Sequence, residues 1–238
     1  QLQFVRSWIE AGAPEEGVVS TEELLLDSNK YSPPEFTPLK PPKKGIQLHL
    51  KPFEVMPNFE REFFQYTNLD VSEDIYANRI QIEMRPGSHH FILYSFIKNI
   101  NPSDLPEFDV PRELRYENGV YNIQTLRSMQ YHEFFNGTQW PRMDYKLPPG
   151  VAFRLDSNFG LDQNSHYVNR TDSIMIGEVY TNIHTVDKSE VLHEAKVINW
   201  SNQNIFLPPK KITTLNKSFY TNKPIYVGQL FSHAHEKM

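Results

Sequence analysis

Residues 79 to 97 read Arg-Ile-Gln-Ile-Glu-Met-Arg-Pro-Gly-Ser-His-His-Phe-Ile-Leu-Tyr-Ser-Phe-Ile, and this stretch decides the fold class. Arg79 to Met84 alternates polar and apolar side chains, which is typical of a strand with one face on a core. Arg85-Pro-Gly87 is a turn signal. Phe91 to Ile97 is apolar on both sides, as in a strand covered on both faces. The stretch therefore predicts two strands joined by a turn.

Similar short runs continue on both sides of this stretch. Ile46 to Leu50 and Val151 to Leu155 alternate in the same way, and Pro148-Pro-Gly150 and Glu117-Asn-Gly119 are further turn signals. Strands at this density, without strong helical patterns between them, predict an all-β protein built as an antiparallel β-sandwich.

The N-terminal region follows a different pattern. A helix is predicted in residues 1 to 14, with a face formed by Phe4, Val5, Trp8 and Ile9. Gly-Ala-Pro14 ends it. Residues 15 to 44 are rich in X-Pro pairs such as Ser32-Pro33, which favour extended backbone, so we expect a Pro-rich linker there.

A short motif occurs twice in the chain. Leu147-Pro-Pro-Gly150 precedes His166, and Leu207-Pro-Pro209 precedes a His-x-His motif near the end of the sequence. Two lobes built alike would give this repetition. We therefore expect a first sandwich lobe over residues 45–172 and the start of a second, incomplete lobe over residues 173–238.

The composition excludes several classes of protein. With 13% aromatic and 39% hydrophobic residues, the 238-residue chain can bury a core and is not disordered. A net charge of -5 without a Lys/Arg block argues against a nucleic-acid partner. The longest apolar runs are too short for a membrane span, so we expect a soluble protein. The absence of cysteine excludes disulfides, thiolate zinc sites, iron–sulfur clusters and Cys nucleophiles.

The first of three histidine motifs is Gly87-Ser-His-His-Phe91. Adjacent side chains of a regular strand point to opposite faces, so His89 and His90 can share a metal ion only where the strand is bent or bulged. The preceding Arg85-Pro-Gly87 supplies such an irregularity. The alternative is that one histidine packs in the protein and the other faces solvent.

The second motif is Asn164-Ser-His-Tyr-Val-Asn169, whose His166 would complete a three-imidazole site for copper or zinc. A lone histidine is more often a structural residue.

In the third motif, His233-Ala-His235, the two rings share a strand face and can chelate without distortion. The alternative is a surface pair near a terminus. The apolar run before it, Ile225 to Leu230, favours an inner strand. The other four histidines, His49, His132, His184 and His193, are interpreted as structural or surface residues.

Together the three motifs resemble the copper type II, ascorbate-dependent monooxygenases, the family of peptidylglycine α-hydroxylating and dopamine β-monooxygenases. The resemblance covers about Gly45 to Met238. It rests on the order and spacing of the histidine motifs with the two Leu-Pro-Pro motifs. It implies two jelly-roll-like sandwich lobes that each bind one copper ion. The similarity is strongest to bacterial exported members, so it also implies a periplasmic or extracellular location.

The resemblance assigns His89, His90 and His166 to the first, electron-transferring copper, and His233 and His235 to the second, where oxygen would react. The family's third ligand of the second copper is a Met further along than this chain extends, and Met238 is too close to His235 to match it. In the peptide-hydroxylating enzyme an Arg stands two residues before the His-x-His motif and binds the substrate carboxylate; here that residue is Phe231. The expected substrate is therefore a small molecule other than a peptide C-terminus.

The resemblance implies a monooxygenase that hydroxylates an unactivated C–H bond with O2 and an external electron donor, either a small reductant or a cytochrome domain. The helix around Trp8 is similar to the closing helix of small c-type cytochrome domains, although a plain amphipathic helix explains it equally well. Haem is therefore expected only upstream of Gln1. Two alternatives stay open: a non-catalytic copper-binding or electron-transfer module attached to a cytochrome, and a structural or adhesion sandwich.

Overall fold

The computed structural model describes residues 2–13, 16, 35–202 and 204–230, and the chain divides into two units at residues 35/36. In the first unit, α1 (Leu2–Glu10) is an α-helix. It is followed by Gly12 and Ala13, whose backbone φ angles are 86° and 50°. Residues with positive φ commonly end helices. The helix predicted in residues 1 to 14 is thus confirmed, whereas its likeness to a cytochrome helix stays a prediction. None of the described helices has the length and apolar character needed to cross a membrane.

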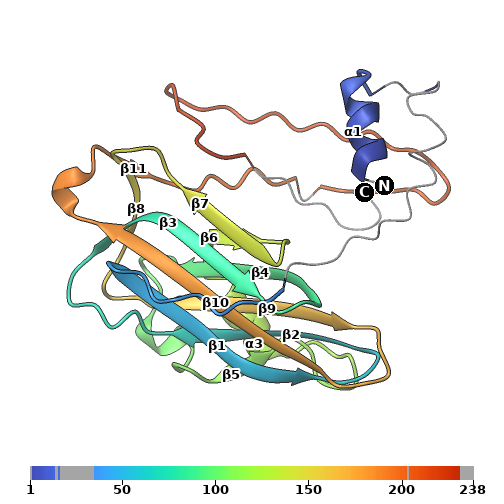
Figure 1. Cartoon of the computed structure of the whole chain (residues 1–238), viewed down its shortest axis with the longest axis horizontal. Coiled ribbons are helices and arrows are strands. Elements are labelled where there is room, and N and C mark those ends of the chain that lie inside the picture. Colours follow the sequence, from blue (N-terminus) through green and yellow to red (C-terminus); the bar gives the residue numbers. More distant parts are fainter. Residues whose placement is uncertain (1, 14–15, 17–34, 203, 231–238) are drawn as a thin grey trace. The chain divides into compact units, whose positions relative to one another are not determined.

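The second unit is a sandwich of two sheets (Figure 1). The strands of the first sheet, in spatial order, are β1 (Gly45–Val55), β10 (Met175–Val186), β3 (Ile75–Met84), β8 (Val151–Leu155) and β11 (His193–Ala195), with β7 (Arg142–Lys146) also paired to β3. The strands of the second are β5 (Pro111–Glu113), β2 (Phe59–Thr67), β9 (Leu161–Asn169), β4 (Ser88–Phe96) and β6 (His132–Thr138). Short helical segments are η1 (Pro102–Asp104), α3 (Ile123–Met129) and η2 (Lys188–Glu190).

Successive long strands alternate between the two sheets. β1 and β3 lie in the first sheet, and β2 and β4 lie in the second. Later in the chain, β9 lies in the second sheet and β10 in the first. All named strand pairs are antiparallel except β8 with β11. This winding is that of a jelly roll. The prediction of an all-β antiparallel sandwich is therefore confirmed.

The core lies between the sheets and is built from one face of each strand. On β3 the buried residues include Ile80 and Ile82, and on β4 they include Phe91 and Leu93, so each strand contributes every second side chain. Tyr167 of β9 is fully buried among them. The sandwich therefore gains its stability from apolar packing, in a chain that has no cysteine.

The expected boundary between residues 172 and 173 is wrong. β10 begins at Met175 and pairs with β1 on one side and with β3 on the other, so it is an internal strand of the first sandwich. The described residues between 196 and 230 form no helix or strand. Ile225 to Leu230, expected to be an inner strand, is exposed coil. No described strand pairs with it, and its backbone is contacted by the Tyr145 hydroxyl, which donates to the carbonyl of Gly228 (3.1 Å).

Candidate metal centre

The chain turns at Gly87 directly before the first two histidines. Gly87 has a φ of 97°, a conformation that residues with a Cβ atom rarely adopt, and a Cβ there would also displace the end of the Met175 side chain, so glycine is strongly favoured. Along β4, Ser88 pairs with Tyr167 and His90 pairs with His166, and the register shifts at the residue between them. The irregularity predicted at the His-His pair is confirmed, and it lets His89 turn toward His90.

His90 and His166 face each other across neighbouring strands. They are direct partners in the β4–β9 ladder, so both rings stand on the same face of the sheet. Phe91 and Ser165, the next residue pair, point to the opposite, core side. The His pair therefore lies on the outer face of the second sheet.

The three rings meet through their Nδ1 atoms. The Nδ1 atoms of His89 and His90 are 3.2 Å apart, and those of His90 and His166 are 3.4 Å apart. One ring nitrogen from each of the three lies within 4.8 Å of those of the other two. Ligand atoms bound at about 2.0–2.1 Å around a tetrahedral ion would lie roughly 3.3–3.4 Å apart. The predicted convergence of the three rings is thus confirmed, and the spacing suits a metal ion.

The far nitrogen of His90 is fixed by an amide. Asn164 Oδ1 lies 2.8 Å from His90 Nε2, while its Nδ2 donates to Glu62 Oε1 (3.1 Å) and to the carbonyl of Phe63 (3.4 Å). Both of these oxygens act as acceptors, so the amide nitrogen must face them and the amide oxygen must face His90. His90 therefore carries its proton on Nε2, which leaves the Nδ1 lone pair facing the other rings.

The far nitrogen of His166 is fixed by a carboxylate. Glu60 Oε1 lies 2.7 Å from His166 Nε2 and accepts a hydrogen bond from its N–H group. Burial lowers the pKa of His166, an effect that the nearby Glu62 partly opposes. The ring is therefore neutral at neutral pH, with the Nδ1 lone pair available to a metal.

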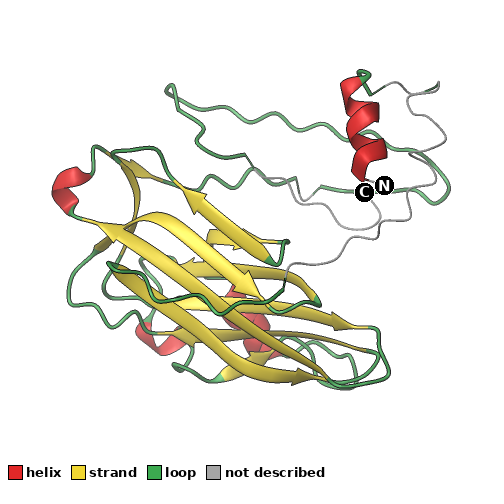
Figure 2. Cartoon of the chain, in the orientation of Figure 1, coloured by secondary structure: helices red, strands yellow, loops and turns green. Residues whose placement is uncertain are grey.

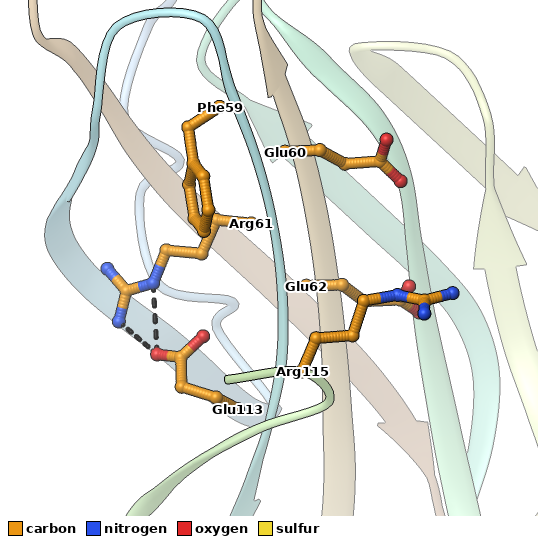
Figure 3. A pocket seen from close by; sticks show the side chains of 6 residues that line it. All are labelled: Phe59, Glu60, Arg61, Glu62, Glu113 and Arg115. Atoms are coloured by element: carbon orange, nitrogen blue, oxygen red, sulfur yellow. Dashed lines mark hydrogen bonds and ion pairs between the residues drawn. The ribbon is translucent and has the colours of Figure 1, made fainter. Parts of the chain in front are cut away.

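Glu60 and Glu62 stand on the same side of β2, and Figure 3 shows them pointing away from Arg61. With Glu113 and Arg115 they line a hollow of about 190 Å³. Burial acts to raise the pKa of Glu62, but its interactions with His90, His166 and Asn164 outweigh that effect and lower it. Glu62 therefore places a negative charge beside the centre.

The centre is open to solvent on one side. His89 is exposed, His90 is half-buried and His166 is buried. Lone pairs that converge at 3.2–3.4 Å repel one another unless a proton or a cation lies between them. Three imidazoles without a thiolate suit copper or zinc, and the exposed side leaves room for a further ligand.

The remaining candidate residues lie elsewhere. His233, His235 and Phe231 fall outside the described residues. The four histidines interpreted as structural are not part of the cluster. His49 contacts Glu178, His132 contacts Asp162, His184 contacts Gln81, and His193 is exposed on β11.

Sequence reasoning missed Glu60, Glu62 and Asn164. Asn164 precedes His166 by two residues on the same strand face, so a period of two along the strand was an available signal. The two glutamates come from β2, and their partnership with β9 depends on a long-range register that no local pattern encodes. Comparison of the chain with protein-family models, curated proteins and solved structures found no match.

Proposed function

We propose that this chain is the copper-binding part of an ascorbate-type, two-copper monooxygenase, and that His89, His90 and His166 hold its electron-transferring copper. One observation carries the proposal: three Nδ1 atoms face one another while hydrogen bonds at Nε2 hold two of the rings in the tautomer that binds metal. The order of the histidine motifs along the chain supports the same family.

The proposed reaction, rather than the donor set, calls for a metal that cycles between oxidation states. Zinc suits three imidazoles equally well but has no redox chemistry, whereas copper bound here would supply one-electron transfer. The chain's own residues position the ligands. The bulge brings His89 to the site, Asn164 orients His90, and Glu60 orients His166. The exposed His89 leaves the centre accessible to a small reductant or a cytochrome domain.

The second half of the proposed reaction belongs to His233 and His235, which would hold the copper at which O2 and a small substrate meet. The i, i+2 spacing of this pair supports chelation by one strand face. Phe231 in the position of the family's carboxylate-binding Arg supports a substrate other than a peptide C-terminus. The proposed product is an alcohol formed at an unactivated C–H bond.

A second candidate is a non-catalytic electron-transfer module. It is favoured by the presence of one histidine cluster within the described ranges, because a single copper bound by three imidazoles is enough to relay electrons. The two candidates differ in whether oxygen is consumed with formation of a hydroxylated product.

The full chain, loaded with copper and reduced, should consume oxygen in the presence of a panel of small apolar and aromatic substrates and release hydroxylated product. His166→Ala and His233→Ala should each abolish product formation, whereas His193→Ala, which alters an exposed histidine outside the cluster, should not. Copper binding that is lost in His166→Ala, without oxygen uptake in the parent, would instead support the electron-transfer module. A chain that binds no copper would leave only a structural sandwich.

A further inference from the structure

A nine-residue loop crosses the outer face of the first sheet, on the opposite side of the sandwich from the histidine cluster. Residues 36–44 run across the strands of this sheet before β1 begins (Figure 2). Gln47 Nε2 donates to the carbonyl of Leu39 (2.8 Å), and Asn182 Nδ2 donates to the carbonyl of Lys40 (2.9 Å). Hydrogen bonds from two neighbouring strands therefore hold the loop backbone against the sheet.

A hollow of about 490 Å³ lies between this loop and strands β3, β7 and β10. None of the described residues that line it carries a carboxylate. Its lining includes five cationic side chains: Lys40, Lys43, Lys44, Arg79 and Lys146. Such a concentration of positive charge contrasts with the net charge of -5 of the whole chain.

Two of the five cations are already neutralised by carboxylates at the rim. Lys44 Nζ lies 2.6 Å from Asp187, and the Arg79 guanidinium contacts both oxygens of Asp144 (2.6 and 2.5 Å). In the part of the chain that the structure describes, the three other lysines form no ion pair. The hollow therefore has an excess of three positive charges.

We infer that this hollow binds a phosphate-bearing anion with at least two negative charges, either a small phosphorylated molecule or a phosphorylated headgroup. Lysine ammonium groups bind phosphate as point charges, whereas planar carboxylates are best recognised by a free guanidinium fork. Among the described lining residues only Arg79 carries a guanidinium, and Asp144 occupies it. The volume is in the range of small-molecule sites.

His184 adds a polar group to the hollow rather than a charge. Its Nε2 lies 2.6 Å from Gln81 Oε1. Burial first, and the neighbouring Arg79 second, lower the pKa of His184, with Asp144 opposing them. The ring is therefore neutral at neutral pH, and the attraction for an anion comes from the lysines. Its position in the lining makes it a reporter of binding.

Calorimetric titration of the full chain with inorganic pyrophosphate, at low ionic strength, tests the inference. We expect saturable binding that Lys43→Gln/Lys146→Gln weakens at least tenfold and that salt weakens through screening. Lys98→Gln, which alters an exposed lysine after β4 that is not in the lining, should bind like the parent. The ring signals of His184 should shift in NMR spectra on addition of pyrophosphate.

Two kinds of phosphatidylcholine vesicle, with and without a phosphorylated inositol lipid, separate the two sources of phosphate. Binding of pyrophosphate alone assigns the hollow to a soluble ligand, and co-sedimentation with the phosphorylated vesicles assigns it to a headgroup. The inference is overturned if neither probe binds, if Lys98→Gln weakens binding as much as the double variant, or if the His184 signals do not move. All substitutions are at exposed side chains, so loss of folding does not confound the result.

Discussion

The outer face of the second sheet carries a polar cluster at each of two ends, and β9 contributes a residue to both clusters. Asp162 and His166 lie on the same side of β9, four residues apart. At one end Asp162 is fully buried and accepts hydrogen bonds from the Arg112 guanidinium (2.5 and 2.6 Å) and His132 Nε2 (2.8 Å). At the other end, His166 Nδ1 faces the like atom of a second histidine at 3.4 Å. One end is complete in itself, whereas the other brings together ring nitrogens that a proton or a cation would have to bridge.

The surroundings of the two ends explain this difference. Near Asp162, Ser128 of α3 accepts a hydrogen bond from Arg112 Nη1 (2.7 Å), and the Tyr94 ring stacks on His132 at 4.4 Å. Among the described residues nothing comparable covers His89, which is exposed. With these partners and this cover, His132 stabilises the fold. His166, whose Nδ1 meets other histidines, is instead a candidate metal ligand.

The largest expected effect is on stability, from Asp162→Ala. The substitution removes the fully buried acceptor that the half-buried Arg112 and His132 share, and removing one partner of a buried pair typically costs about 3–5 kcal/mol. Urea unfolding measures the change in the free energy of unfolding. Asp144→Ala, which breaks an exposed pair with Arg79, should cost about 0–1 kcal/mol. Equal losses in the two variants would show that Asp162 contributes no more to stability than an exposed ion pair does.

His166→Ala should show the opposite balance, with a large loss of metal affinity and a small loss of stability. Because His166 is itself a proposed ligand, the loss of metal affinity should exceed the roughly 10- to 100-fold loss that follows removal of a ligand's hydrogen-bond partner. Copper and zinc titrations, followed by equilibrium dialysis, measure it. His193→Ala is the matched control, because His193 is exposed and lies outside the cluster. Retention of full affinity in His166→Ala would exclude this residue as a ligand.

The smallest expected effect comes from Glu60. Glu60→Ala removes the acceptor of the His166 Nε2 proton and should weaken metal binding by about tenfold, at the low end for such partners because the carboxylate is largely exposed. Glu60→Gln keeps an acceptor oxygen and should recover part of the loss. Glu113→Gln serves as the control, since Glu113 lines the same hollow but pairs with Arg61 (Figure 3). If both Glu60 variants bind metal like the parent, Glu60 does not hold the ring in place.

Much of the fold and the core of the site follow from local patterns. Two strands and an irregularity at the start of the second can be predicted from three local features. These are the alternation of Arg79 to Met84, the turn at Gly87 and the adjacent histidines. These features depend on a few neighbouring residues, and the period of two in a strand makes each side chain's face readable.

The features that sequence alone did not reveal depend on long-range pairing. β10 was assigned to a second lobe because the repeated Leu-Pro-Pro motif suggested two similar units, yet Gly45 and His184 are direct partners across 139 residues of chain. Glu60 and Glu62 reach the histidines only through the register of β2 against β9. A strand's face can be read from its sequence, but its neighbour cannot.

Copper X-ray absorption of the full chain carrying His233→Ala and His235→Ala tests the central claim most directly. The double variant removes the other histidine motif and leaves His89, His90 and His166 intact. We predict one tightly bound copper per chain, with three imidazole nitrogens at about 2.0 Å, and the loss of that signal when His166→Ala is added. A double variant that binds no copper, or binds it without imidazole scattering, would contradict the assignment of this cluster as a metal centre.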